Sequence, residues 1–328
     1  MDGIAFNLID QHGRRKRKLR ISLTDRCNFQ CRYCMPEHPK WLPKTQLLSF
    51  EEIVRVARLM VADGIRHIRL TGGEPLLRRD AVACVRALDA LRAEGLERIS
   101  MTSNASLLAP LAVDLKAAGL DDLNISLDSV VPATFKHMTG RELQPVIDGI
   151  DAARAAGLPI KLNSVLLRDD NGAQIAELVA WSRERGLPLR FIEYMPLDAP
   201  GRWQREQVVS EVEIVEALRV HHRVEALPRS ADPATRYRLD DGYEFGVIST
   251  VSNPFCASCD RLRITATGEL YTCLFAQSGT PLRELLRGSA TDELLLETIR
   301  DAVWRKDAGY VAKRGPVERP ITMHAMGG

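Results

Sequence analysis

Three cysteines stand close together near the start of the chain. Cys27, Cys31 and Cys34 follow the spacing Cys-x3-Cys-x2-Cys, directly after an apolar, β-branched run. One loop can therefore wrap all of them around a single metal centre. A structural zinc site is closed by four ligands, whereas a four-iron cluster held by three thiolates keeps one iron open for another ligand. We interpret the motif as ligands of a 4Fe-4S cluster, in preference to paired structural cysteines.

A second group of cysteines lies in the last third of the chain. Cys256 and Cys259 are followed by Cys273 across a predicted hairpin. A zinc ribbon would need a second cysteine pair, and the nearest preceding pair, Cys31/Cys34, ends 222 positions before Cys256, since 256 − 34 = 222. Ribbon sites use much shorter spacings, so a second cluster is favoured over zinc. The seventh cysteine, Cys84, is expected to be a buried core residue of a helix.

The segments that must position these groups alternate between short β-branched runs and longer amphipathic runs. We expect strands at Leu19–Thr24, His67–Thr71, Arg98–Thr102, Leu123–Leu127, Ile160–Leu166 and Leu189–Tyr194. We expect helices at Phe50–Ala62, Ala81–Ala93, Leu107–Ala118, Val146–Ala156 and Ala173–Arg185. This alternation predicts a parallel sheet, either open and doubly wound or closed as a barrel. In both folds a ligand lies at the C-terminal ends of the strands.

The pattern changes after residue 222. Shorter β-like runs follow, with turn signals at Asp241–Gly242 and Thr267–Gly268, and then two helical segments at Leu282–Arg287 and Asp292–Lys306. We therefore predict two units, residues 1–222 and residues 223–328.

Composition excludes several classes of protein. The chain has 328 residues, 45% of them hydrophobic, and a formal net charge of +2, so it has no global field of the kind that binds nucleic acid or membranes. The N-terminus has no apolar signal-peptide core, and no run approaches the length of a membrane helix. We expect a cytoplasmic protein. The basic run at residues 14–18 is interpreted as a solvated arm in preference to a nucleic-acid patch.

The cysteine motif and a glycine-rich segment together resemble a known superfamily. Tyr33 lies inside the first cysteine motif, and Thr71-Gly72-Gly73-Glu74-Pro75 follows the second predicted strand. Both features resemble the radical S-adenosylmethionine enzymes. Further segments narrow the resemblance to the GTP 3′,8-cyclase family of molybdenum cofactor biosynthesis. They are LRISLTDRCNFQCRYCMP, RLTGGEPLLRRD, NISLDS, RFIEYMP, FCASCDRLRITATGELYTCLF and the terminal Gly-Gly. The resemblance covers about Leu19 to Gly328.

This resemblance implies a fold, cofactors and a reaction. The expected fold is α/β, an incomplete (βα)6 TIM-like barrel with a smaller C-terminal α+β region that closes the barrel mouth. The expected cofactors are two 4Fe-4S clusters, the first on Cys27, Cys31 and Cys34, together with S-adenosylmethionine. The first cluster would release a 5′-deoxyadenosyl radical that takes hydrogen from the ribose 3′ carbon of GTP. The sugar radical would then attack C8 of guanine to give 3′,8-cyclo-7,8-dihydro-GTP.

The family also implies site residues. Its second cluster, here on Cys256, Cys259 and Cys273, would hold the guanine base. The S-adenosylmethionine site would be lined by Tyr33, Gly73, Thr102, Ser126 and Met195, although Thr102 and Met195 could instead belong to the core. The triphosphate would be bound by Arg20, Arg69, Lys161, Arg190, Arg261 and Arg263, for which surface salt bridges are the alternative. Several relatives carry a lysine where this chain has His67, which could make GTP binding sensitive to pH.

The tail has several interpretations. Gly327 and Gly328 could be a frayed end, a carrier-protein tail or an insertion into the active site. We favour insertion, with Arg20, Gly327 and Gly328 as catalytic residues. By family expectation the protein is a homodimer, takes electrons from a flavodoxin or ferredoxin, and passes its product to cyclic pyranopterin monophosphate synthase. A peptide-modifying maturase with an auxiliary cluster and a non-catalytic metal-bearing interaction protein are the alternative functions.

Overall fold

The computed structural model describes residues 7–197, 203–229, 232–309 and 322–327. Within them, a single sheet of 12 strands has the order β12-β11-β10-β1-β2-β3-β4-β5-β6-β9-β8-β7. The strands are β1 (Lys18–Ser22), β2 (His67–Thr71), β3 (Arg98–Ser103), β4 (Asp122–Ser126), β5 (Ile160–Leu166), β6 (Leu189–Glu193), β7 (Val224–Ala226), β8 (Thr235–Leu239), β9 (Glu244–Ile248), β10 (Arg261–Ile264), β11 (Glu269–Tyr271) and β12 (Thr280–Pro281).

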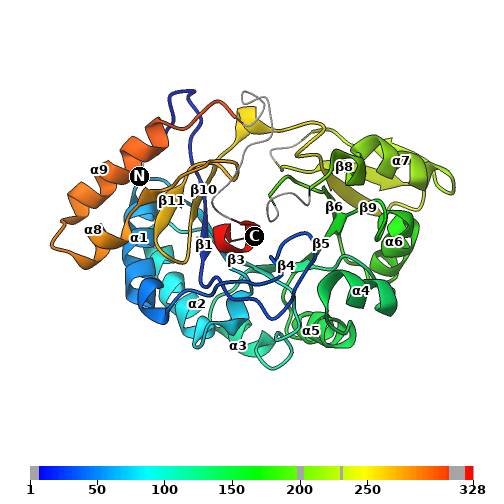
Figure 1. Cartoon of the computed structure of the whole chain (residues 1–328), viewed down its shortest axis with the longest axis horizontal. Helices are drawn as coiled ribbons and strands as arrows, with labels where there is room; N and C mark the ends of the chain where they lie inside the picture. Colours follow the sequence, from blue (N-terminus) through cyan, green and yellow to red (C-terminus); the bar gives the residue numbers. More distant parts are fainter. Residues whose placement is uncertain (1–6, 198–202, 230–231, 310–321, 328) are drawn as a thin grey trace.

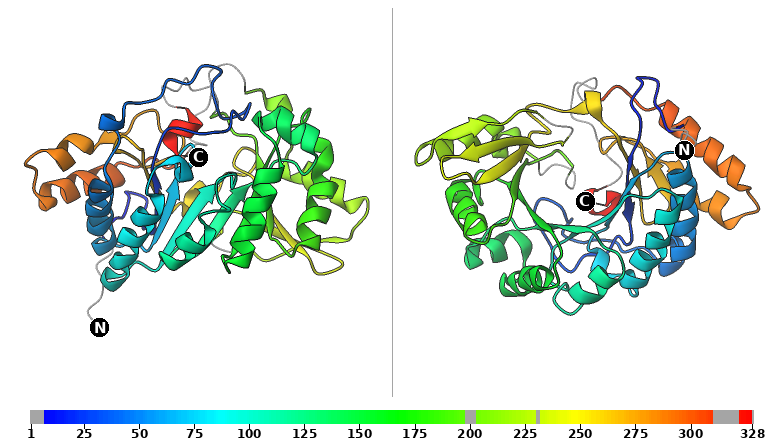
Figure 2. Two further views of the ribbon diagram at one scale, coloured as in Figure 1. Left: turned by 90° about the horizontal axis from the view of Figure 1, so that it is seen from below. Right: turned by 180° about the vertical axis from the view of Figure 1, so that it is seen from behind.

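Helices cover the outer face of this curved sheet (Figures 1 and 2). They are α1 (Phe50–Ala62), α2 (Ala81–Asp89), α3 (Ala112–Ala117), α4 (Pro132–Thr139), α5 (Gln144–Ala155), α6 (Ile175–Glu184), α7 (Glu211–Arg219), α8 (Arg283–Arg287) and α9 (Asp292–Trp304), whereas the short helix α10 (Met323–Met326) lies on the concave side. Each of the first three parallel strands is followed by a helix that crosses back to the start of the next strand, as a βα repeat requires. The predicted parallel α/β sheet is confirmed.

The C-terminal region extends both edges of the parallel sheet. β10 pairs in parallel with β1, and β9 pairs in parallel with β6. The antiparallel strands β11 and β12 then continue one edge, while β8 and β7 continue the other. Because strands from both sides of residue 222 share this sheet, its hydrogen bonding runs across the predicted boundary. The division into two units at 222/223 stays a prediction.

The side chains of β1 alternate between two very different surroundings. Leu19 and Ile21 are fully buried and pack in the same core as Ile53 and Val56 of α1. Arg20 and Ser22 alternate with them and so face the other, concave side of the sheet. Branched apolar residues usually fill a TIM-barrel interior. A concave face that carries arginine and serine is therefore shaped for a ligand instead of for packing.

Two predicted helices differ from their expected limits by more than two residues at one end. The helix expected at Leu107–Ala118 begins only at Ala112, because Pro110 lacks an N–H and cannot occupy a helix interior. The helix expected at Ala81–Ala93 changes to a 3-10 turn at Ala90 and ends at Gly95, whose φ of 108° lies in the left-handed region.

The C-terminal end of the described chain lies on the concave side of the curved sheet. α10 sits within the concave side of the sheet in both views (Figures 1 and 2). No helix in the described ranges has the length and apolar character needed to cross a membrane.

Candidate functional site

The first three cysteines lie on one loop directly after β1. The amides of Cys34 and Met35 both donate to the carbonyl of Cys31, which turns the loop back on itself. The Phe29 amide donates to the Cys27 sulfur over 3.4 Å, and the Asn104 side-chain amide lies 3.9 Å from the same sulfur. Donors around a sulfur are typical of the shell around an iron–sulfur cluster.

Burial controls the chemistry of these thiols. It raises the pKa of Cys27 to about 11 and that of Cys34 to about 12, with the neighbouring acidic groups adding to the effect, and it raises the pKa of Cys31 well above its ordinary value. Without a cation the three sulfurs are therefore protonated at neutral pH. A metal centre supplies the positive charge that thiolates need in such surroundings, so the residues fit a cluster.

The described ranges contain no single-ion site built from three or more acidic, histidine or cysteine ligands. No three or more His, Cys, Asp or Glu side chains there gather closely enough to hold one metal ion. A four-iron cluster is much larger than one ion, so its ligand sulfurs lie further apart.

The glycine-rich segment after β2 supports the first cysteine loop. The Gly73 amide donates to the Thr24 carbonyl over 2.9 Å, and the Glu74 amide donates to the Arg26 carbonyl over 2.8 Å. A Cβ on Gly73 would lie 2.4 Å from the Arg26 carbonyl oxygen. Only glycine therefore allows this close approach to the backbone that leads into Cys27. A contact from Gly73 to S-adenosylmethionine stays a prediction.

Glu74 is a buried group to which the sequence reasoning assigned no role. Its carboxylate accepts hydrogen bonds from the Leu76 amide, the Ser103 hydroxyl and the Asn104 amide, at 3.1, 2.9 and 2.7 Å. Burial raises the pKa of Glu74 to about 7. Glu74 thus joins the end of β2 to the end of β3 and fixes Asn104 beside the Cys27 sulfur. The position of Glu74 within the Gly-Gly-Glu-Pro segment was the sequence feature that could have indicated this structural role.

The other residues predicted for S-adenosylmethionine lie at neighbouring strand ends. The Tyr33 hydroxyl donates to the Asp128 carboxylate over 2.7 Å, and burial raises the pKa of Asp128 to about 6. Thr102 on β3 and Ser126 on β4 are half-buried, as is Met195, which follows β6. Since neither Thr102 nor Met195 is fully buried, both keep surface that a ligand could contact.

Three predicted phosphate-binding arginines lie side by side on neighbouring strands. Arg20 on β1 is the register partner of Arg69 on β2 and of Arg263 on β10. Burial, then the charges of Arg263 and Arg69, hold the pKa of Arg20 well below its ordinary value. Burial likewise lowers the pKa of Arg69 and that of Arg263 to about 10. Like charges held this close in a partly buried row repel one another, and an anion bound among them lowers that cost.

Two buried donors near this row lack partners within the described residues. They are Nη1 of Arg263 and the side-chain nitrogen of Asn124. Asn124 also accepts a hydrogen bond from Arg190 over 2.6 Å and is the register partner of Lys161. Buried polar groups are normally satisfied, so orphaned donors of this kind indicate a ligand that accepts hydrogen bonds.

The remaining predicted cations belong to the same group. Arg261 and Arg190 both contribute to lowering the pKa of Arg20, and Arg190 does the same for Lys161. The structure therefore brings all six predicted cations into one region of the concave face. His67 lies 3.3 Å from the Glu97 carboxylate, and burial lowers its pKa.

The second cysteine group lies where the chain crosses from β9 to β10. Cys256 and Cys259 are in this crossing, and Cys273 follows β11. The buried carboxylate of Glu193, at the end of β6, accepts hydrogen bonds from the amides of Val251 and Ser252 over 2.9 and 2.8 Å. These bonds attach the start of the crossing to the C-terminal end of the parallel sheet. The sequence reasoning assigned no role to Glu193.

The prediction of a solvated arm at residues 14–18 is wrong for two of its basic residues. The Lys16 side chain is fully buried, and Arg14 is nearly so. Lys16 donates to the Cys259 carbonyl and Arg14 donates to the Cys256 carbonyl, each over 2.9 Å. Their charges are compensated by Asp10, which lies 2.6 Å from both. This part of the run therefore belongs to the second cysteine site.

The tail reaches the ends of β1 and β2. A Cβ on Gly327 would lie 2.7 Å from the Thr71 hydroxyl and 3.0 Å from Cβ of Ser22, and Gly327 has a φ of 84°. Glycine is required here by both space and conformation. His324 is buried one turn earlier, with its ring 6.0 Å from that of Trp41. Gly328 lies outside the described residues, and a catalytic role for Gly327 stays a prediction.

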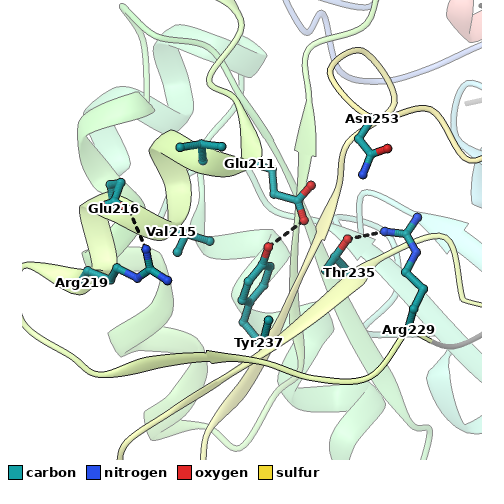
Figure 3. Close-up of a pocket in the computed structure, with 10 residues that line it drawn as sticks. Glu211, Val215, Glu216, Arg219, Arg229, Thr235, Tyr237 and Asn253 are labelled. Atoms are coloured by element: carbon teal, nitrogen blue, oxygen red, sulfur yellow. Dashed lines mark hydrogen bonds and ion pairs between the residues drawn. The ribbon is translucent and has the colours of Figure 1, made fainter.

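A pocket of about 460 Å³ lies elsewhere, between α7 and the β7–β8 hairpin (Figure 3). Glu211 and Tyr237 line it, joined by a 2.9 Å hydrogen bond. None of the predicted site residues is among those that line it.

Two family models match the chain. Residues 21–182 match the Radical SAM superfamily, and residues 187–312 match Molybdenum Cofactor Synthesis C. Among curated proteins, the chain is 46% identical to a GTP 3′,8-cyclase of Streptomyces coelicolor, over 93% of this chain and 91% of that protein. It is 45% identical to a GTP 3′,8-cyclase of Rhodopirellula baltica, over 98% of this chain and 92% of that protein.

Solved structures show the same fold at much lower identity. The crystal structure of Streptococcus suis SuiB bound to precursor peptide SuiA superposes with a TM-score of 0.63 at 15% identity, covering 87% of this chain and 67% of that one. A histidine-tagged form of anSMEcpe with bound AdoMet gives a TM-score of 0.51 at 14% identity, covering 62% of this chain and 57% of that one.

Proposed function

The chain belongs to the GTP 3′,8-cyclase family of the radical SAM superfamily, and from this premise we propose that it converts GTP to 3′,8-cyclo-7,8-dihydro-GTP at the start of molybdenum cofactor biosynthesis. The observation that carries the proposal is the row of neighbouring arginines Arg263–Arg20–Arg69 on the concave face, in which Arg263 is buried and the other two are half-buried. A triphosphate supplies several anionic oxygens to this row of cations, and guanidinium forks suit phosphate oxygens.

The first cysteine loop would hold a 4Fe-4S cluster on Cys27, Cys31 and Cys34. When bound, the cluster and S-adenosylmethionine supply the 5′-deoxyadenosyl radical chemistry of the superfamily. The chain's own contribution is to fix this loop, through Gly73 below it and the Asn104 amide beside the Cys27 sulfur. We assign Tyr33, Gly73, Thr102, Ser126 and Met195 to S-adenosylmethionine.

Arginine and lysine side chains would hold the substrate. We assign Arg20, Arg69, Lys161, Arg190, Arg261 and Arg263 to the triphosphate. Their role is to place the ribose at a fixed distance from the first cysteine loop, because proximity and orientation supply much of the rate of a reaction between two bound partners. The orphaned donors of Arg263 and Asn124 gain acceptors when phosphate oxygens arrive.

Cys256, Cys259 and Cys273 would hold a second 4Fe-4S cluster that takes the guanine base. Support comes from the position of the three thiols next to β10 and β11, since β10 carries Arg261 and Arg263. We assign catalytic roles to Arg20, Gly327 and Gly328, since Gly327 lies against the ends of β1 and β2 next to the arginine row. Homodimerisation, a flavodoxin or ferredoxin donor, and transfer of product to cyclic pyranopterin monophosphate synthase are further parts of the proposal.

The test begins with anaerobic reconstitution with iron and sulfide. We expect about eight irons per chain, as two four-iron clusters require, and 5′-deoxyadenosine formation that depends on GTP. Cys27→Ala should abolish cleavage of S-adenosylmethionine, whereas Cys259→Ala should keep uncoupled cleavage and lose GTP conversion. Cys84→Ala is the matched control, because Cys84 is buried in the apolar core and should leave both activities intact. Equal loss of cleavage in Cys27→Ala and Cys259→Ala would contradict the proposed division of roles.

The maturase alternative has weaker support. It rests on a likeness of fold to SuiB at 15% identity, whereas the two cyclases named above match nearly the full chain at 45% and 46% identity. Cleavage of S-adenosylmethionine that is indifferent to GTP would return this alternative to consideration.

A further inference from the structure

A buried ammonium group lies against the second cysteine site. Lys306, just after α9, is a buried residue with 3% of its surface exposed. Its Nζ donates to the Cys259 sulfur over 3.4 Å, to the Arg261 carbonyl over 3.2 Å, and to the Thr272 carbonyl. These contacts reach the chain on both sides of the site, since Thr272 immediately precedes Cys273.

Lys306 has no carboxylate partner within the described ranges. Every hydrogen bond that its ammonium makes there goes to a carbonyl oxygen or to the Cys259 sulfur. A buried unpaired cation is costly, so it persists where it meets a negative group. The cysteine sulfur is that group, and a cluster carried by three thiolates would add negative charge at the same place.

The rest of the surrounding structure fixes the geometry of this contact. Arg14 and Lys16 hold the carbonyls of Cys256 and Cys259, while Asp10 compensates both cations. Gly309 closes the other side, because a Cβ there would lie 2.7 Å from the Cys256 sulfur. Two lysines from separate segments therefore contact Cys259: Lys16 at its carbonyl and Lys306 at its sulfur.

We propose that Lys306 is a positioning residue of the second cluster, which sets the reduction potential of that cluster by donating a charged hydrogen bond to the Cys259 sulfur. This inference rests on the proposed second cluster. Reduction adds negative charge to a cluster, so a fixed cation at a ligand sulfur stabilises the reduced form and raises the potential. The N-terminal cluster has only neutral donors at its Cys27 sulfur among the described residues, from Phe29 and Asn104. The two clusters therefore receive different electrostatic surroundings.

The experiment is an EPR-monitored redox titration of reconstituted full-length protein without substrate. In Lys306→Met, which removes the charge and the donor, the second cluster's midpoint potential should shift to more negative values, and the first cluster's potential should stay unchanged. Lys306→Arg should restore most of the wild-type potential because it keeps the charge. Arg305→Met is the matched control. The Arg305 side chain, next to Lys306 in the sequence, is 76% exposed and pairs with Asp301, so both potentials should match wild type.

Iron content and thermal stability separate the possible failures. Wild type with only about four irons would overturn the second cluster itself. Wild type with about eight irons, combined with an unchanged second potential in Lys306→Met, would overturn only the role of Lys306. Loss of the second cluster in Lys306→Met but not in Lys306→Arg would support the charge-based role. Loss in both variants, with the first cluster intact, would overturn it, because shape alone would then be what the site requires.

Discussion

Replacing Arg263 with methionine separates what the arginine row does for binding from what it does for stability. Arg263 is buried, its Nη1 has no hydrogen-bond partner among the described residues, and its strand neighbour in register is another arginine, the half-buried Arg20. In the ligand-free protein this arrangement is unfavourable. Methionine replaces the aliphatic stem of arginine, carries no charge and needs no hydrogen bond, so the substitution should remove that cost.

The expected magnitudes have opposite signs. A buried unsatisfied donor costs roughly 1–3 kcal/mol, so Arg263→Met should stabilise the ligand-free protein by about 1 kcal/mol, or about 2 °C in Tm for a protein of this size. Loss of a charged contact to a bound phosphate should weaken GTP binding by about 2 kcal/mol or more. That free energy corresponds to an increase in Kd of about 30-fold.

Calorimetric titration of GTP into anaerobically reconstituted protein measures the binding, and thermal unfolding without GTP measures the stability. Arg79→Met serves as control, because its side chain is 95% exposed and should change neither quantity. GTP should also raise the Tm of wild type more than that of Arg263→Met, since a ligand stabilises the state that binds it. A variant that binds GTP as tightly as wild type, or that loses several degrees of Tm, would refute the reasoning.

Two further predictions concern the region around the first cysteine loop. Gly73→Ala places a Cβ 2.4 Å from the Arg26 carbonyl, so overpacking should cost about 1–3 kcal/mol and lower both iron retention and S-adenosylmethionine cleavage; full activity in this variant would contradict the close approach. The pKa of Glu74 is raised to about 7 in the folded protein, so the folded state binds more protons than the unfolded state between about pH 4.5 and 7, and the Tm should fall as pH rises through that range. Glu74→Gln should reduce this slope in thermal unfolding measured from pH 5 to 8, and an identical slope in both proteins would show that another group is responsible.

The sequence determined the features that depend on neighbouring residues. Cys27, Cys31 and Cys34 lie on one loop because they are close along the chain and follow a strand. The six N-terminal strands are found within one or two residues of their predicted limits, since period-two burial and the alternation with helices are local properties. The arginines were found through the resemblance, and their placement on one face follows from strand alternation: Arg20 and Arg69 become neighbours once β1 and β2 pair in register.

Only the tertiary structure decided which distant segments meet. Lys16 and Cys259 are 243 positions apart, and Lys306 and Cys259 are 47 apart. No local pattern distinguishes these buried lysines from solvated ones, because their burial results from the packing of both ends of the chain around β10. The strands β9 and β10 were expected as short runs, but their parallel pairing with β6 and β1 depends on the edges that the first six strands leave available. Long-range pairing of this kind is settled by the whole fold, since each edge strand must satisfy its backbone groups against whatever partner the chain brings to it.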